Sequence, residues 1–381
     1  MSRFFLLFSL SLAGLLSTSC GRVDNTAVAK VAREEQPTVP LDRWADDVGR
    51  YLGGMPAKPG SKLEAVHQDP LFKAHAVGFD DSWANFEKSR QPAMQRFQQS
   101  ELADKIFADS TLYYPFGGPD TLTATTFFPN NKHYLLMGLE PPGDVPSEDE
   151  LRQKPLGSYL PQIRGTLNTL LSKSFFITQF MAVQVRGQIT DGLLPLMLVQ
   201  LVRTNHTVLG TLQVTVDSEG NLVERQEGIK GIAGVLVEFQ RNGSTEKKRL
   251  VYLSGNLSNI PLEKNQPLLK FLNKQKPMVT YFKAASYLCH SPNFTLIRDK
   301  ILSLSSAILQ DDSGIPFKHY DPKIWDVQLY GNFDHPYGSF QNKRQPDLKT
   351  AYEGPGVKPL DFPIGYGFSR IQAGLQLARK K

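Results

Sequence analysis

Cysteine is scarce in this chain of 381 residues, which contains only Cys20 and Cys289. The spacings CxxC, HExxH and GxSxG do not occur, so the common signatures of redox, zinc-protease and serine-hydrolase sites are missing. After the N-terminal segment, no stretch approaches the roughly 20 unbroken apolar residues that a membrane-spanning helix requires. A polytopic membrane protein is therefore excluded.

The charges are evenly mixed along the chain. Lys and Arg number 43 against 37 Asp and Glu, giving a formal net charge of +6 without a clustered basic face. This pattern argues against nucleic acid as a partner and is compatible with weak attraction to anionic lipid or glycan. With 40% hydrophobic and 21% charged residues, the composition is that of a globular protein with one large or two modest domains.

The N-terminus has the features of a bacterial export signal. Arg3 precedes the apolar run FFLLFSLSLAGLL, and small residues lead to Cys20. Residues 1–19 are therefore predicted to be a signal peptide. The site resembles a lipoprotein signal, in which the cysteine receives a diacylglycerol and fatty acids such as palmitate. The usual leucine three positions before the cysteine is Ser17 here, so a plain secreted protein is the alternative.

We therefore expect a protein of the bacterial cell envelope, anchored to the membrane through lipidated Cys20. It would face the periplasm or the cell surface, with the outer membrane favoured. Residues 21–40 are polar, rich in small residues and without apolar periodicity, which is typical of a flexible tether.

The stretch from Thr111 to Asp144 predicts the central unit of the fold. An apolar run over 112–116 meets a glycine turn, a short helical segment follows, and a second apolar run covers 134–139. This order is that of a strand, a helix and a parallel strand. Asp120 and Glu140 would then lie at the same edge of a sheet, where open α/β sheets bind ligands.

The rest of the chain predicts a mixed α/β (α+β) fold. Residues 41–204 would form an α/β half with covering helices, including one over 193–202 and a capping box at Ser147 and Glu150. Residues 205–381 would form an antiparallel meander over 208–216, 234–240 and 250–253, followed by C-terminal helices, the last ending near residue 309. We expect the two halves to pack as one globular unit.

Three groups of residues are candidates for chemistry. The turn Gly117-Gly118-Pro119-Asp120 opens a helix, whose free N–H groups attract anions, although a structural turn explains it equally simply. Asp311 and Asp312 follow a predicted helix, whose negative end disfavours them unless a cation or solvent compensates. A turn that reverses the chain is the alternative there. His290 is the third candidate, or else a structural histidine.

Six sequence blocks carry a resemblance: PFGGPD, FFP, GLEPPG, KAASYLCH, ILQDDSGIPF and LYGNFDHP. In this order they resemble a family of bacterial envelope proteins without an assigned activity, over roughly residues 41–368. The positions that match its motifs are Pro115, Gly118, Pro119, Asp120, Glu140, His290, Asp311, Asp312 and Gly314. Cys289 stands where the family more often has methionine, which argues against a catalytic thiol.

Two functions follow as hypotheses. The favoured one is a binding or organising protein of the envelope, whose cleft takes a small anion, a glycan or a partner peptide; its ligand contacts would be Gly117, Gly118, Asp120, Glu140, Asp311 and Asp312. The alternative is a hydrolase that uses the same carboxylates and His290 as acid and base, or that holds a divalent cation with them. The sequence names neither a reaction nor a metal.

Overall fold

The computed structural model describes residues 37–173, 192–228, 231–367 and 373–381, which belong to one compact unit. The predicted signal peptide, Cys20 and the predicted tether up to residue 36 lie outside the described residues. The last residues of that tether pack on the folded unit, where Val39 is buried. No helix among the described residues is long and apolar enough to span a bilayer.

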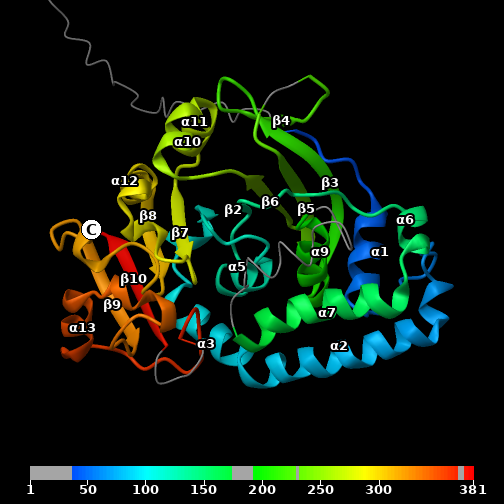
Figure 1. The fold of residues 1–381 in the computed structure, drawn as a ribbon, viewed down its shortest axis with the longest axis horizontal. Coiled ribbons are helices and arrows are strands. Elements are labelled where there is room, and N and C mark those ends of the chain that lie inside the picture. Colours follow the sequence, from blue (N-terminus) through cyan, green and yellow to red (C-terminus); the bar gives the residue numbers. More distant parts are fainter. Residues whose placement is uncertain (1–36, 174–191, 229–230, 368–372) are drawn as a thin grey trace, which may run out of the picture. The chain divides into compact units, whose positions relative to one another are not determined.

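A ten-stranded mixed sheet runs through the unit (Figure 1). The strand order is β4-β3-β5-β6-β2-β1-β7-β8-β10-β9. The bounds are β1 (Thr111–Tyr114), β2 (His133–Gly138), β3 (His206–Val216), β4 (Leu222–Glu224), β5 (Gly234–Arg241), β6 (Lys247–Ser254), β7 (Met278–Phe282), β8 (Ser305–Gln310), β9 (Trp325–Gly331) and β10 (Gly374–Lys380). The five central strands, from β6 to β8, are parallel, and the flanking strands pair antiparallel.

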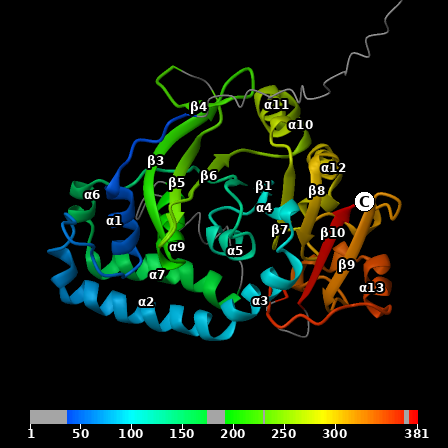
Figure 2. The same cartoon turned by 180° about the vertical axis from the view of Figure 1, so that it is seen from behind.

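Helices cover both faces of the sheet (Figures 1 and 2). One face packs against α1 (Arg43–Leu52), α2 (Pro70–Ser89), α3 (Gln91–Glu101), α5 (Thr121–Phe127), α7 (Leu156–Lys173) and α9 (Leu194–Arg203), and the other against α10 (Asn259–Lys264), α11 (Gln266–Lys274) and α12 (Thr295–Leu304). The shorter helices are α4 (Lys105–Ala108), α6 (Glu148–Gln153), α13 (Pro346–Glu353), η1 (Val66–Gln68), η2 (Leu288–His290), η3 (Pro292–Phe294), η4 (Phe317–His319) and η5 (Gly338–Lys343).

Strand β1 shows how the sequence produces two cores. Leu112 and Tyr114 point into the core under α5 and α9, whereas Tyr113 points into the core under α10–α12. Alternate residues of a strand face opposite sides of the sheet, so a strand covered on both faces is apolar at every position. This accounts for the continuous apolar runs of the central strands.

The predicted α/β fold class is confirmed. The unit β1-α5-β2 has its two strands in parallel register, Leu112 opposite Tyr134. The meander β3-β5-β6 is antiparallel, as its β-branched runs predicted. The capping box is also present, because Ser147 accepts from the Glu150 N–H and the Glu150 carboxylate accepts from the Ser147 N–H.

The prediction of a helix up to residue 309 is wrong for residues 305–309. Helix α12 ends at Leu304, and residues 305–310 form β8, buried between β7 and β10. Leu304 and Ile308 are four residues apart, a spacing that fits a helix as well as it fits the end of a helix followed by a buried strand. Asp311 and Asp312 therefore follow a parallel strand, and the argument from a helix dipole does not apply to them.

One further expectation needs correction. The C-terminal part was expected to be helical, yet strands β7, β8, β9 and β10 extend the sheet there. Because β7 and β8 are short and fully covered, they show no alternation that the sequence could reveal.

Candidate functional site

The carboxyl ends of β1, β7 and β8 meet at one edge of the sheet. The three strands are neighbours and run parallel, so the loops that follow them emerge side by side. Asp120 lies on the first loop, Lys283 begins the second, and Asp311 and Asp312 begin the third. Asp120 and the aspartate pair therefore lie at the same edge of the sheet, and Lys283 lies between them in the strand order.

The glycine turn after β1 is tightly held by its surroundings. Gly118 has φ +53°, as expected of a bend that needs glycine, and a Cβ on Gly117 would lie 2.6 Å from the Tyr114 ring. Gln200 of α9 donates to the Pro119 carbonyl at 2.8 Å and accepts from the Leu122 N–H at 2.9 Å. The Asp120 carboxylate accepts the Thr123 N–H at 3.1 Å as the cap of α5. Internal groups thus take up these helix N–H groups, which were candidates for binding an anion.

Asp120 forms a buried ion pair with Lys283. The Lys283 Nζ lies 2.5 Å from the Asp120 Oδ2, and the two side chains are 2% and 1% exposed. Tyr114 and Thr123 donate hydroxyl hydrogen bonds to the same carboxylate oxygen. Burial lowers the pKa of Lys283, and the charge of Asp120 opposes that shift. Asp120 and Lys283 together form a closed structural centre beneath the loops.

Asp311 is also buried, and backbone groups satisfy its carboxylate. It accepts the Ala284 N–H at 2.8 Å, and the Ser313 N–H and hydroxyl at 3.0 and 2.5 Å. Gly365, with φ +59°, lies so close that a Cβ there would be 1.9 Å from the Asp311 Oδ2. Burial raises the pKa of Asp311, while these hydrogen bonds and Lys283 oppose the shift. Asp311 thus ties the β7 and β8 loops to the C-terminal segment.

Asp312 differs from its neighbour because it borders a pocket. Its carboxylate accepts the Tyr287 hydroxyl, and its backbone hydrogen-bonds the His290 ring. Burial, followed by the charge of Asp311, raises the pKa of Asp312 to about 7. Burial lowers the pKa of His290 to about 4, so this histidine is neutral at pH 7. Asp312 can therefore gain or lose a proton near neutral pH.

The loop after β7 has a strained backbone. Ala284, Ser286 and Tyr287 have φ values of +50°, +52° and +53°, a region that non-glycine residues rarely occupy. The Tyr366 hydroxyl contributes to holding this loop through contacts with the Ala284 carbonyl at 3.2 Å and the Ser286 hydroxyl at 3.1 Å. Such strain persists where surrounding contacts enforce it, and it is common at ligand sites. Here it places the Tyr287 ring beside Asp312.

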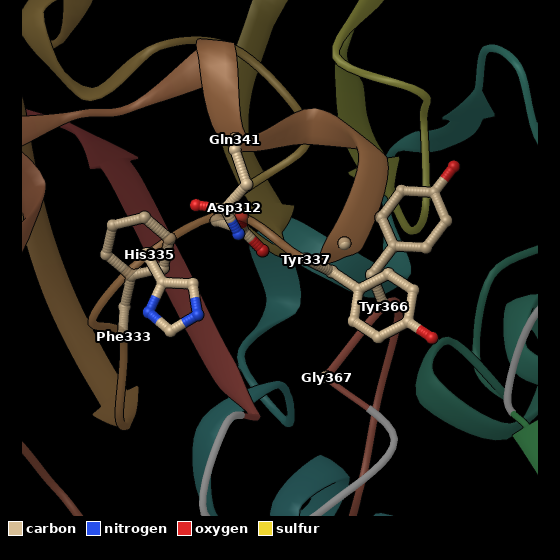
Figure 3. Close-up of a pocket in the computed structure, with 8 residues that line it drawn as sticks. Asp312, Phe333, His335, Tyr337, Gln341, Tyr366 and Gly367 are labelled. Atoms are coloured by element: carbon tan, nitrogen blue, oxygen red, sulfur yellow. The ribbon is translucent and has the colours of Figure 1, made fainter.

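The pocket beside Asp312 has a volume of about 300 Å³ (Figure 3). Its lining comes from the β8 loop and from C-terminal segments far along the chain: Asp312, Phe333, His335, Tyr337, Gly338, Gln341, Tyr366 and Gly367. Figure 3 shows Asp312 with Gln341 and His335 on one side and the rings of Tyr337 and Tyr366 on the other. Aromatic walls with a few polar groups are typical of small-molecule sites.

Three tyrosine rings form a nearly parallel series along one wall. Tyr337 and Tyr366 have centroids 6.2 Å apart at an interplanar angle of 6°, and Tyr366 and Tyr287 are 6.2 Å apart at 5°. Phe340 packs against both Tyr366 and Tyr287. Tyr337 is 40% exposed, so its ring is accessible to a ligand. The wall presents flat π-surfaces next to a carboxylate.

The other candidate residues lie elsewhere. Glu140 lies just after β2. A Cβ added to Gly138 would lie 3.2 Å from the Glu140 Oε2 and 3.3 Å from the Gly118 Cα, so these two groups are close to each other. Its carboxylate is thus beside the glycine turn and does not line the pocket.

Cys289 is buried, which raises its pKa to about 12 and makes it a poor nucleophile. Among the described residues, no group of three or more His, Cys, Asp or Glu is arranged to hold a metal ion.

Sequence reasoning missed Lys283 and the aromatic wall. Lys283 follows five consecutive buried residues of β7, and this position at the end of a buried strand was the available signal. Tyr337 and Tyr366 occur in segments rich in Gly and Pro that showed no periodicity.

Comparison of the sequence with models of known protein families and with curated proteins gave no match.

Proposed function

We propose that this chain is a lipid-anchored protein of the bacterial envelope whose folded part binds a small glycan in the Asp312 pocket. The anchor is inferred from the N-terminal sequence around Cys20, and the resemblance of its sequence blocks to an envelope family supports the same location. The polar segment that precedes Val39, a residue buried in the folded unit, would let that unit reach envelope glycans near the membrane.

The arrangement of the pocket lining supports a sugar as ligand. The C–H groups of a sugar face are apolar and carry slight positive charge, so they pack on the negative face of an exposed aromatic ring such as that of Tyr337. Asp312, Gln341 and His335 supply acceptors and donors for hydroxyl groups on the opposite side. The volume of about 300 Å³ suits a ligand of one or two sugar rings.

A small anion fits this site less well than a glycan. The carboxylate of Asp312 would repel it, and the amides of the glycine turn already have internal partners.

The hydrolase alternative needs two carboxylates at the reacting bond. Of the four acidic candidates, only Asp312 lines the pocket. Asp311 accepts hydrogen bonds from backbone N–H groups, and Asp120 forms an ion pair with Lys283. These observations favour binding over hydrolysis.

Tyr337→Ala should weaken binding of N,N′-diacetylchitobiose about tenfold, which corresponds to about 1.4 kcal/mol. The substitution removes the exposed ring of the wall and leaves Asp312 in place. Isothermal calorimetry on the purified protein measures the effect, with Tyr337→Phe as the matched control because it keeps the ring. Equal affinities for the wild type and the alanine variant would contradict the proposed function.

A further inference from the structure

We propose that the glycan bound in this pocket is an amino sugar with a free ammonium group, which lies against the Asp312 carboxylate beside the rings of Tyr337 and Tyr366. This inference rests on the proposed function and names the class of its ligand. It starts from the charges buried beneath the pocket.

The buried acids outnumber the cations that face them. Asp120, Asp311 and Asp312 converge on the loops after β1 and β8, and Lys283 is shared between Asp120, its ion-pair partner, and Asp311, which it influences from farther away. Arg90 is also buried; it interacts with the charge of Asp120 and donates to the Leu170 carbonyl. Within the residues that the structure describes, no Lys, Arg or His nitrogen forms an ion pair with Asp312.

The histidines near the pocket do not supply the missing charge. His290 is neutral at pH 7 because burial lowers its pKa to about 4. His335 lies at the pocket wall, where its Nδ1 is 2.8 Å from the Asp334 carboxylate, a partner outside the pocket. A half-buried carboxylate without a cation, such as that of Asp312, is costly, and a ligand that brings the cation gains the corresponding interaction.

The aromatic wall favours the same kind of ligand. A cation within about 6 Å of a tyrosine ring is attracted by the negative face of its π-system. Tyr337, which is 40% exposed, presents such a face on the side of the pocket opposite Gln341 and His335, and Tyr366 packs beside it. A carboxylate and aromatic faces around one small cavity are the usual surroundings of a bound organic ammonium group. A neutral N-acetyl sugar would use the rings and leave Asp312 without a cation.

The proton on Asp312 provides an independent signature. An ammonium group beside Asp312 favours its ionised form, so binding should release a proton at pH values below about 7, the pKa of the free site. Affinity should therefore rise from about pH 5 to about pH 7 and fall again when the sugar amine loses its own proton. The titratable groups that face Asp312 are Asp311, Tyr287, His290, Tyr352 and Tyr366, with His335 across the pocket.

The test compares two disaccharides that differ only in their N-acetyl groups, chitobiose with free amines and N,N′-diacetylchitobiose, by calorimetry on the full protein. We expect the free amine to bind about tenfold to a hundredfold more tightly near pH 7. Its ammonium group would form a hydrogen bond to the charged Asp312 carboxylate, and a hydrogen bond to a charged group changes affinity by about this factor. Asp312→Asn should bring the ratio of the two affinities to about one. Asp326→Asn, which removes an exposed carboxylate from β9, is the matched control and should keep the ratio.

The outcomes separate the two proposals. If the acetylated disaccharide binds as tightly as the free amine, or more tightly, the ammonium inference is overturned and the glycan site stands. If neither sugar binds the wild-type protein, both proposals fail. An unchanged preference in Asp312→Asn would also overturn the inference, because it places the ammonium group away from this carboxylate.

Discussion

Replacing Lys283 with methionine should lower the free energy of unfolding by about 3–5 kcal/mol, because removing one partner of a buried ion pair leaves an uncompensated charge. The partner is Asp120, whose carboxylate is 1% exposed and also caps α5. Methionine matches the length of the lysine stem, so loss of packing contributes little. Urea denaturation followed by circular dichroism measures the change.

Two comparisons make this result specific to the buried pair. Lys358→Met removes an ion pair with Glu101 in which the lysine is 48% exposed, and it should change stability by about 0–1 kcal/mol. The double variant Lys283→Met with Asp120→Asn should recover part of the loss, since neither charge then remains buried. A Lys283 variant no less stable than the Lys358 variant would show that the pair does not hold the loops together.

Cys20→Ala should leave an unprocessed precursor or a soluble protein in the bacterial envelope, in place of a lipidated mature protein in the membrane fraction. The thiol of Cys20 is the proposed site of acylation, and lipid chains are the only proposed attachment to the bilayer. Fractionation with immunoblotting and intact-mass measurement of the mature protein detect the change. Cys289→Ala is the matched control, because this second cysteine is buried in the folded unit and should leave the distribution unchanged. An unaltered membrane fraction and an unaltered mature mass in Cys20→Ala would contradict the anchor.

The sequence revealed those parts of the fold that local patterns specify. The unit β1-α5-β2 was predictable because two apolar runs flank a glycine turn and a short helical segment at the spacing of a parallel crossover. The meander was predictable because its β-branched runs are separated by turn residues. Strand β8 was not, since the spacing of Leu304 and Ile308 continues the pattern of α12 and a doubly buried strand has no alternation.

The site was only half visible in the sequence. Asp120, Glu140 and the pair Asp311-Asp312 were expected to share one cleft, and for the pair this was argued from a helix dipole. In the structure the pair follows β8 at the same sheet edge as Asp120, and of these four residues Asp312 alone lines the pocket. Lys283 could not be distinguished from a surface lysine without knowing the strand order. Tyr337 and Tyr366 reach Asp312 through contacts between segments up to 54 residues apart in the chain, which no local pattern reports.

A crystal structure of the protein grown with chitobiose tests directly whether a glycan binds between Asp312 and the tyrosine wall. We expect electron density for a sugar ring against Tyr337 and Tyr366, with the amine within about 3 Å of a carboxylate oxygen of Asp312. Density for the sugar beside Gly118 and Glu140 instead, with the Asp312 pocket empty, would contradict it.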